Sequence, residues 1–141
     1  MSILKALSTP ILFAALSGQS PPAKYSEGQV WEYKTRVGDE GSLLKIQRIE
    51  QDPASQKHGP IYHISVVGVH LRNPAVAPVL PHAPVSQDTL DASVTKLSSD
   101  KREFPSADAG IAEWRQAHGG VFTISVAEIV EIMDQQTASI H

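Results

Sequence analysis

Residues 41–74 read "GSLLKIQRIEQDPASQKHGPIYHISVVGVHLRNP", and this stretch decides the fold. Its two apolar parts, residues 42–50 and 61–73, contain many β-branched residues, which is typical of strands. Residues 51–60 between them are polar and contain proline and glycine, which favour a loop. The stretch therefore predicts two strands joined by a polar loop.

The second of these strands changes its pattern along its length. The apolar alternation runs through Tyr62, Ile64 and Val66 and then shifts to odd positions from Val67 onward, with Gly68 at the change. Neighbouring residues of a strand point to opposite faces of a sheet. A β-bulge or sharp twist near residues 66–68 explains the shift, and so does a strand that is buried on both faces.

A further strand is predicted immediately before this stretch. In residues 29–37, "QVWEYKTRV", the apolar residues Trp31, Tyr33 and Val37 alternate with charged ones. Residues 38–41, "GDEG", have the composition of a turn. We therefore expect residues 29–37 and 42–50 to form a hairpin.

Residues 73–85 contain four of the ten prolines in the chain. Proline fixes one backbone dihedral and has no amide hydrogen to donate, so this composition favours an extended connector with polyproline II character. Because the segment also contains apolar residues, we expect it to lie against the domain.

The second half of the chain is predicted to be mainly helical. One helix spans residues 86–97 with Ser86 as its N-cap, and another spans residues 106–120. A short strand at residues 121–124 precedes a third helix at residues 125–136, where Ser125 and Glu128 have the spacing of a capping box. The order β-β-β-α-α-β-α predicts an α+β fold, a mainly antiparallel sheet with helices packed on one face.

Length and composition limit the class of protein. The chain has 141 residues, 41% hydrophobic content and a net charge of −3, which suit one folded domain, here placed at residues 29–137. A mildly acidic chain without a basic cluster is not expected to bind nucleic acid. The chain contains no cysteine, which excludes disulfides, thiolate nucleophiles and cysteine-ligated metals.

The N-terminal residues have the order of a secretory signal peptide. A single cation at Lys5 is followed by an apolar run and then by small residues, with a cleavage site expected after residue 17. Residues 18–28 are predicted to be a flexible segment. An amphipathic helix is the alternative, which Pro10 disfavours. We expect a periplasmic or secreted bacterial protein without stable membrane insertion once the signal is removed.

The sequence shows no recognisable catalytic or metal-binding pattern. Its six histidines include no H-x-H or H-x-x-x-H spacing, and His63 and His70 are too far apart along one strand to share an ion. A G-x-S-x-G motif and a glycine-rich phosphate loop are also absent from the sequence. We therefore predict no catalytic residue, no metal and no cofactor, although a triad assembled only in space would leave no such motif.

Charge is distributed unevenly, and this suggests another protein as the partner. Residues 24–72 carry seven Lys and Arg against six Asp and Glu, whereas residues 85–141 carry four against nine. An acidic side can steer a basic partner. Six candidate partner-binding residues lie on the polar side of the sheet and along the last helix: Arg48, His63, His70, Glu128, Glu131 and Asp134. The alternative is that these residues form an ordinary solvated sheet face and a solvated helix face.

The function expected from these observations is that of a small exported, non-enzymatic protein-binding module. Bacterial inhibitors and immunity-type proteins are examples of this class. A periplasmic ligand-binding or envelope accessory domain is the first alternative, and a small hydrolase with a spatially assembled site is the second. An enzyme should contain an enclosed pocket with two titratable groups of perturbed pKa, whereas a binding module should present an exposed apolar or charged patch.

Overall fold

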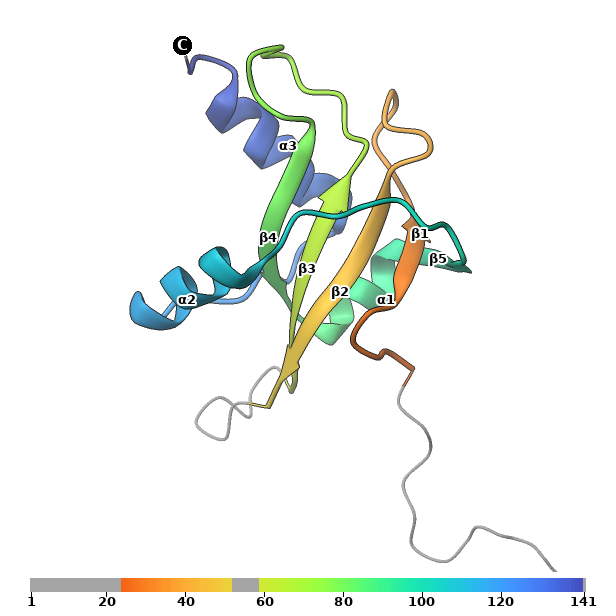
Figure 1. The fold of residues 1–141 in the computed structure, drawn as a ribbon, viewed down its shortest axis with the longest axis vertical. Helices are drawn as coiled ribbons and strands as arrows, with labels where there is room; N and C mark the ends of the chain where they lie inside the picture. Colours follow the sequence, from red (N-terminus) through yellow and green to blue (C-terminus); the bar gives the residue numbers. More distant parts are fainter. Residues whose placement is uncertain (1–23, 52–58, 141) are drawn as a thin grey trace, which may run out of the picture.

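The computed structural model describes residues 24–51 and 59–140. Within these residues the chain forms, in order, β1 (Val30–Tyr33), β2 (Leu43–Glu50), β3 (Ile61–Val67), β4 (Val79–Val85), α1 (Gln87–Ser93), β5 (Val94–Ser98), α2 (Asp108–Gln116) and α3 (Val126–Thr137). The five strands form one antiparallel sheet in the order β4-β3-β2-β1-β5 (Figure 1). The predicted α+β class with a mainly antiparallel sheet is therefore confirmed.

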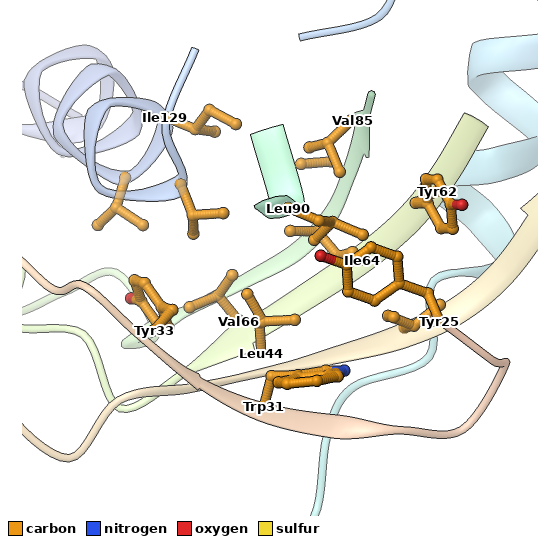
Figure 2. Close-up of a cluster of buried hydrophobic side chains, with 14 of the residues drawn as sticks. Tyr25, Trp31, Tyr33, Leu44, Tyr62, Ile64, Val66, Val85, Leu90 and Ile129 are labelled. Atoms are coloured by element: carbon orange, nitrogen blue, oxygen red, sulfur yellow. The ribbon is translucent and has the colours of Figure 1, made fainter. Parts of the chain in front are cut away.

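The main hydrophobic core lies between one face of the sheet and helices α1 and α3. Trp31, Leu44 and Ile64 from the sheet pack in one cluster with Leu90 of α1 and Ile129 of α3 (Figure 2). Burial of such side chains contributes about 1.5–3 kcal/mol each relative to full exposure. The expectation of helices on one face of the sheet holds for these two helices.

Helix α2 and the chain that leads to it lie on the opposite face of the sheet. The residues of β3 that alternate with the core residues point to this second face, where the ring of His63 contacts Trp114 of α2. Residues 99–107 cross the same face, and the Pro105 carbonyl accepts a hydrogen bond of 2.9 Å from the Gln47 side chain of β2 (Figure 1). Every residue of β3 is buried as a result. The apolar pattern changes because the strand ends at Val67 and the chain turns at Gly68, whose φ is 79°, so that Val69 and Leu71 pack on the main core.

The hairpin of β1 and β2 is confirmed, but β1 is shorter than the sequence predicts. Trp31 is opposite Leu44, and β1 ends at Tyr33 instead of continuing to Val37. The amide of Asp39 donates to the carbonyl of Arg36, so the chain already reverses direction there. Val37 therefore lies in the turn and is fully exposed.

The proline-rich segment contains a strand, which the sequence analysis did not predict. Residues 79–85 form β4, at the edge of the sheet beside β3. Proline is tolerated at a sheet edge, because only one side of an edge strand needs to donate hydrogen bonds to a neighbour. On the outer side of β4, the carbonyl of Pro84 accepts a hydrogen bond from the amide of Phe122.

Two other predicted elements differ from the structure. The first predicted helix stops at Ser93, and Val94 adopts extended backbone angles that begin β5. β5 pairs with the free edge of β1, and this pairing outweighs the helical spacing of the local sequence. The predicted strand at residues 121–124 is a single parallel bridge between Val85 and Phe122.

The described part of the predicted flexible segment packs onto the core. Tyr25 is buried, its ring makes edge contacts with Trp31 and Tyr62, and its hydroxyl donates a 2.6 Å hydrogen bond to Asp91 of α1. The predicted signal peptide, residues 1–17, lies outside the described residues. Among the helices formed by residues 24–51 and 59–140, none is both long and apolar enough to cross a lipid bilayer.

Candidate functional site

The structure separates the six predicted site residues into two groups. His70, Glu128, Glu131 and Asp134 lie together where the β1–β2 turn meets α3. They line an open concavity of about 510 Å³ on the surface, called here the turn–α3 cleft. Its lining consists of Arg36, Val37, His70, Arg72, Ala127, Glu128, Glu131 and Asp134. Arg48 and His63 belong to the second group, on the face of the sheet that α2 covers.

Arg36 is the centre of the charged groups in the turn–α3 cleft. Its Nε donates to Asp39 Oδ2 at 2.7 Å, and its Nη1 donates to both Glu131 Oε1 at 3.0 Å and Asp134 Oδ2 at 2.8 Å. Its Nη2 donates to the backbone carbonyl of His70 at 3.0 Å. Arg36 thus joins the β1–β2 turn, the chain after β3 and helix α3, and its side chain is only 15% exposed.

Arg72 holds the acidic residues of α3 from the other side. Its backbone N–H donates to Asp134 Oδ1 at 2.9 Å, and its Nη2 donates to Glu131 Oε2 at 2.8 Å. The Arg72 backbone hydrogen bond is the main reason that the pKa of Asp134 lies below its usual value. The Arg72 side chain is the main reason that the pKa of Glu131 is also lowered. Both carboxylates are therefore ionised at neutral pH.

These contacts decide what the polar groups of the cleft can do. Asp134 is buried and fully paired, so the prediction of a solvated helix face does not hold for this residue. Four of the five N–H donors of Arg36 are used by protein acceptors, which leaves this residue poorly suited to bind an anion. The ion pairs therefore fix the shape of the cleft.

The turn–α3 cleft is net negative and has an apolar side chain at its edge. Its lining contains two arginines and three carboxylates, those of Glu128, Glu131 and Asp134, and the buried carboxylate of Asp39 pairs with Arg36. Glu128 uses its carboxylate in the capping box at the start of α3, where hydrogen bonds from Ser125 lower its pKa. Val37 in the turn is 100% exposed.

The second group contains a pair of histidines, His63 of β3 and His82 of β4, called here the histidine pair. His63 Nδ1 lies 2.8 Å from His82 Nε2, and the rings are stacked with their centroids 5.0 Å apart. The Trp114 ring of α2 contacts the His63 ring in an edge-to-face arrangement, with the two ring centroids 4.8 Å apart. Gly110 of α2 lies so close to His82 that a Cβ there would come within 2.6 Å of the His82 Cβ.

Burial keeps the histidine pair neutral. His63 has no exposed surface, and burial lowers its pKa to about 4. That value already includes the proximity of His82, which also lowers the pKa, and the carboxylate of Glu50, which raises it. Burial also lowers the pKa of His82. His63 Nε2 makes no hydrogen bond to any described residue and lies 3.5 Å from Glu50 Oε1.

Arg48 does not belong to a pocket with the histidine pair. It forms a 3.3 Å ion pair with Asp108 of α2, and both side chains are largely exposed. Arg115 of α2 likewise pairs with Glu50 of β2. These two ion pairs connect α2 to β2 at the surface, where such pairs contribute about 0–1 kcal/mol.

The sequence does not indicate several residues of the two candidate sites. Arg36 lies in a predicted strand and Asp39 in a predicted turn, and the partners of Arg36 on α3, Glu131 and Asp134, are almost a hundred positions away in the chain. His82 was placed in the connector, so its pairing with His63 across two strands gave no local signal. The exposed position of Val37 was missed because the strand was expected to continue through it.

The described residues contain no group of three or more His, Asp or Glu side chains that could hold a metal ion. Comparison of the chain with protein-family models, with curated proteins and with solved structures finds no match. The functional interpretation of the turn–α3 cleft and the histidine pair therefore depends on their own geometry.

Proposed function

We propose that this chain is a small non-enzymatic module that binds another protein through the turn–α3 cleft. The observation that carries the proposal is Val37, which is fully exposed on a turn that ion pairs hold in place beside an acidic concavity. An apolar anchor with a charged rim is the usual composition of a protein–protein interface.

A single exposed valine is common on protein surfaces, so its surroundings matter more than its exposure. The turn that carries Val37 is fixed on one side by the 2.7 Å contact between Arg36 and Asp39. Asp39 is buried and accepts a second hydrogen bond of 2.8 Å from the amide of His70. Such a turn loses little conformational entropy when a partner binds, which favours affinity.

The chemistry of the cleft also supports binding more than catalysis. A general acid or base needs a titratable group that can exchange a proton with a substrate. In the cleft, Glu131 and Asp134 are held ionised by arginines, and His70 is mostly exposed beside Asp39. The two histidines with lowered pKa values, His63 and His82, lie outside the cleft, beneath α2. A net negative rim instead favours a partner that presents Lys or Arg.

The export of the protein is part of the same proposal. It is supported by the order of charge, apolar run and small residues within residues 1–17. The mature N-terminal residue, determined by mass spectrometry of the protein purified from its own cells, tests this part. A start near residue 18 is expected, and a start at Met1 or Ser2 would contradict export without affecting the cleft.

Site-specific crosslinking tests the binding surface. Because the chain contains no cysteine, a Val37→Cys variant carries a single thiol to which a photoactivatable crosslinker can be attached. The labelled variant is exposed to periplasmic or culture extract, irradiated, and analysed by mass spectrometry. We expect one dominant crosslinked protein, which the Val37→Asp protein should bind at least tenfold more weakly when both are purified.

A Leu97→Cys variant provides the matched control. Leu97 is also an exposed apolar residue, with 51% of its surface accessible, but it lies on β5 and outside the cleft. The dominant protein should not crosslink from this position. Equal crosslinking from both positions, or full affinity of the Val37→Asp protein, would contradict the cleft as the binding surface. Binding of a small molecule without any protein partner would favour the ligand-binding alternative, and turnover would favour the hydrolase.

A further inference from the structure

The histidine pair lies at the centre of the contact between α2 and the sheet. Only Ile111 is buried among the residues of α2, so the apolar attachment of this helix is small. Apart from the two surface ion pairs to β2, its close contacts with the sheet include Trp114 against His63 and Gly110 against His82. The attachment of α2 therefore depends on how well the two imidazoles fit beneath it.

That fit requires both rings to be neutral. At 2.8 Å, one of the facing nitrogens must carry a proton and the other must accept it. Two protonated rings would place two N–H groups and two positive charges against each other. A single proton added to the pair would still be a charge under α2, buried on His63 or half-buried on His82.

The charged groups around the histidine pair do not remove this cost. On β2, Glu50 faces His63 at 3.5 Å, but the same carboxylate oxygen is already paired with Arg115 of α2. Arg48 of β2 adds a positive charge nearby, and its partner is Asp108 of α2. Both arginines disfavour a positive charge on His63, whereas Glu50 is the one group that favours it.

We propose that the histidine pair is an acid-sensitive contact, and that protonation of His63 and His82 releases α2 from the sheet. Release exposes the buried apolar residues of α2 and of the chain before it, including Ala107 and Ile111. The main core is unaffected, because it lies on the opposite face of the sheet.

The direction of the pH effect follows from linkage. A histidine whose pKa is lower when α2 is docked than when it is released stabilises docking above the released pKa. This stabilisation disappears as the pH falls from about 6.5 towards about 4. For His63 alone, the equilibrium constant for release should be about thirty-fold larger at pH 5 than at pH 8. His82 changes it in the same direction.

Hydrogen exchange with mass spectrometry measures this release directly on the full chain. Protection factors, which are corrected for the pH dependence of chemical exchange, are compared for α2 and α3 at pH 8 and at pH 5. We expect the protection of α2 to fall by about thirty-fold or more and that of α3 to change by less than threefold. Constant protection of α2, or an equal fall in both helices, would overturn the proposal.

Variants show whether the histidine pair causes the change. In a His63→Gln, His82→Gln protein the protection of α2 should no longer depend on pH between these values. A His70→Gln protein is the control, since it removes an exposed histidine of the turn–α3 cleft and should keep the full response. A pH response that persists in the double variant would overturn the proposal.

The wild-type protein gives a second measurement in case the double variant does not fold. The ring protons of His63 and His82, followed by NMR, should titrate over the same pH interval as the loss of α2 protection. Titration of these rings while α2 stays protected would overturn the proposal. None of these results depends on whether the turn–α3 cleft binds a partner.

Discussion

Helices α2 and α3 are attached to the same sheet by different chemistry. Helix α3 buries Val126, Ile129 and Val130 in the main core and adds ion pairs from Asp134 to Arg36. Helix α2 buries only Ile111 and otherwise rests on the neutral histidine pair. A helix with a large apolar contact and paired charges should respond little to mild acid, whereas one that rests on neutral imidazoles should respond strongly.

The two attachments should therefore fail at different pH. Asp134 and Glu131 have lowered pKa values, so the stabilisation they provide is present above the ordinary carboxyl range. It is lost only as the pH falls below the ordinary carboxyl range and through their lowered pKa values. The contribution of the histidine pair is lost at higher pH, between about 6.5 and 4. As the pH falls, the attachment of α2 to the sheet should therefore weaken before the attachment of α3.

The largest expected effect comes from removing the charge that holds α3. An Arg36→Met substitution leaves the buried carboxylates of Asp39 and Asp134 without their common partner. Breaking a buried ion pair in this way costs about 3–5 kcal/mol, because one charge remains buried and uncompensated. Urea unfolding followed by tryptophan fluorescence measures the loss.

An Arg48→Met substitution is the matched control for this measurement. Arg48 makes an exposed ion pair with Asp108, so its removal should change the free energy of unfolding by less than about 1 kcal/mol. If the two substitutions cost the same, the buried network would not be the main attachment of the turn to α3. Should Arg36→Met not fold, Arg36→Lys, which keeps the charge but not the forked geometry, should lie between the two.

The sequence could not have revealed this network. Residues 36 and 134 are 98 positions apart, and no spacing rule connects them. Asp134 was selected as a candidate because it lies in line with Glu128 and Glu131 on the predicted helix, but its burial results from the docking of α3 beside Arg72. The local sequence pattern predicts the helix. Only the tertiary fold shows which of its acidic residues is buried against the rest of the protein.

The same limit explains β4. Proline removes a hydrogen-bond donor, so a segment with four prolines predicts no strand from its local sequence. The segment becomes a strand because it lies at the edge of the sheet, where its outer side needs no strand partner. Position in the sheet is a property of the whole chain. The pairing of His82 with His63 was missed for this reason.

A moderate effect is expected where α2 approaches the sheet most closely. Gly110→Ala should favour the helix by up to about 1 kcal/mol through its higher propensity. The added methyl, however, would come within 2.6 Å of the Cβ of His82, which cannot rotate away. We expect a net loss of about 1–2 kcal/mol from this overpacking. It should be measured by urea unfolding, together with reduced protection of α2.

Gly120→Ala is the matched control for that substitution. A Cβ at Gly120 would meet no atom within 4 Å, and this glycine lies just after α2. Its stability should change by less than about 0.5 kcal/mol. A stabilised Gly110→Ala protein would mean that α2 can shift on the sheet without loss, and the close contact with the histidine pair would then be unimportant.

The smallest effect concerns the start of each helix. Ser125 caps α3, since its side chain accepts from the amide of Glu128 and the Glu128 side chain accepts from the amide of Ser125. This capping box was predicted from the sequence, because both partners lie within one helical turn. The N-cap of helix α2 is Ala107, whose side chain makes no such hydrogen bond.

Ser125→Ala should therefore lower the free energy of unfolding by about 1 kcal/mol, and Ser125→Asp, which can still cap, should restore most of it. Exchange of the first α3 amides should increase in the alanine protein, while the exchange of α2 stays unchanged. This result would show that the end of α3 is stabilised independently of its ion pairs. If the alanine protein also lost protection in α2, the two helices would unfold together. The attachment of α3 through Arg36 and the attachment of α2 through the histidine pair would then form a single cooperative unit.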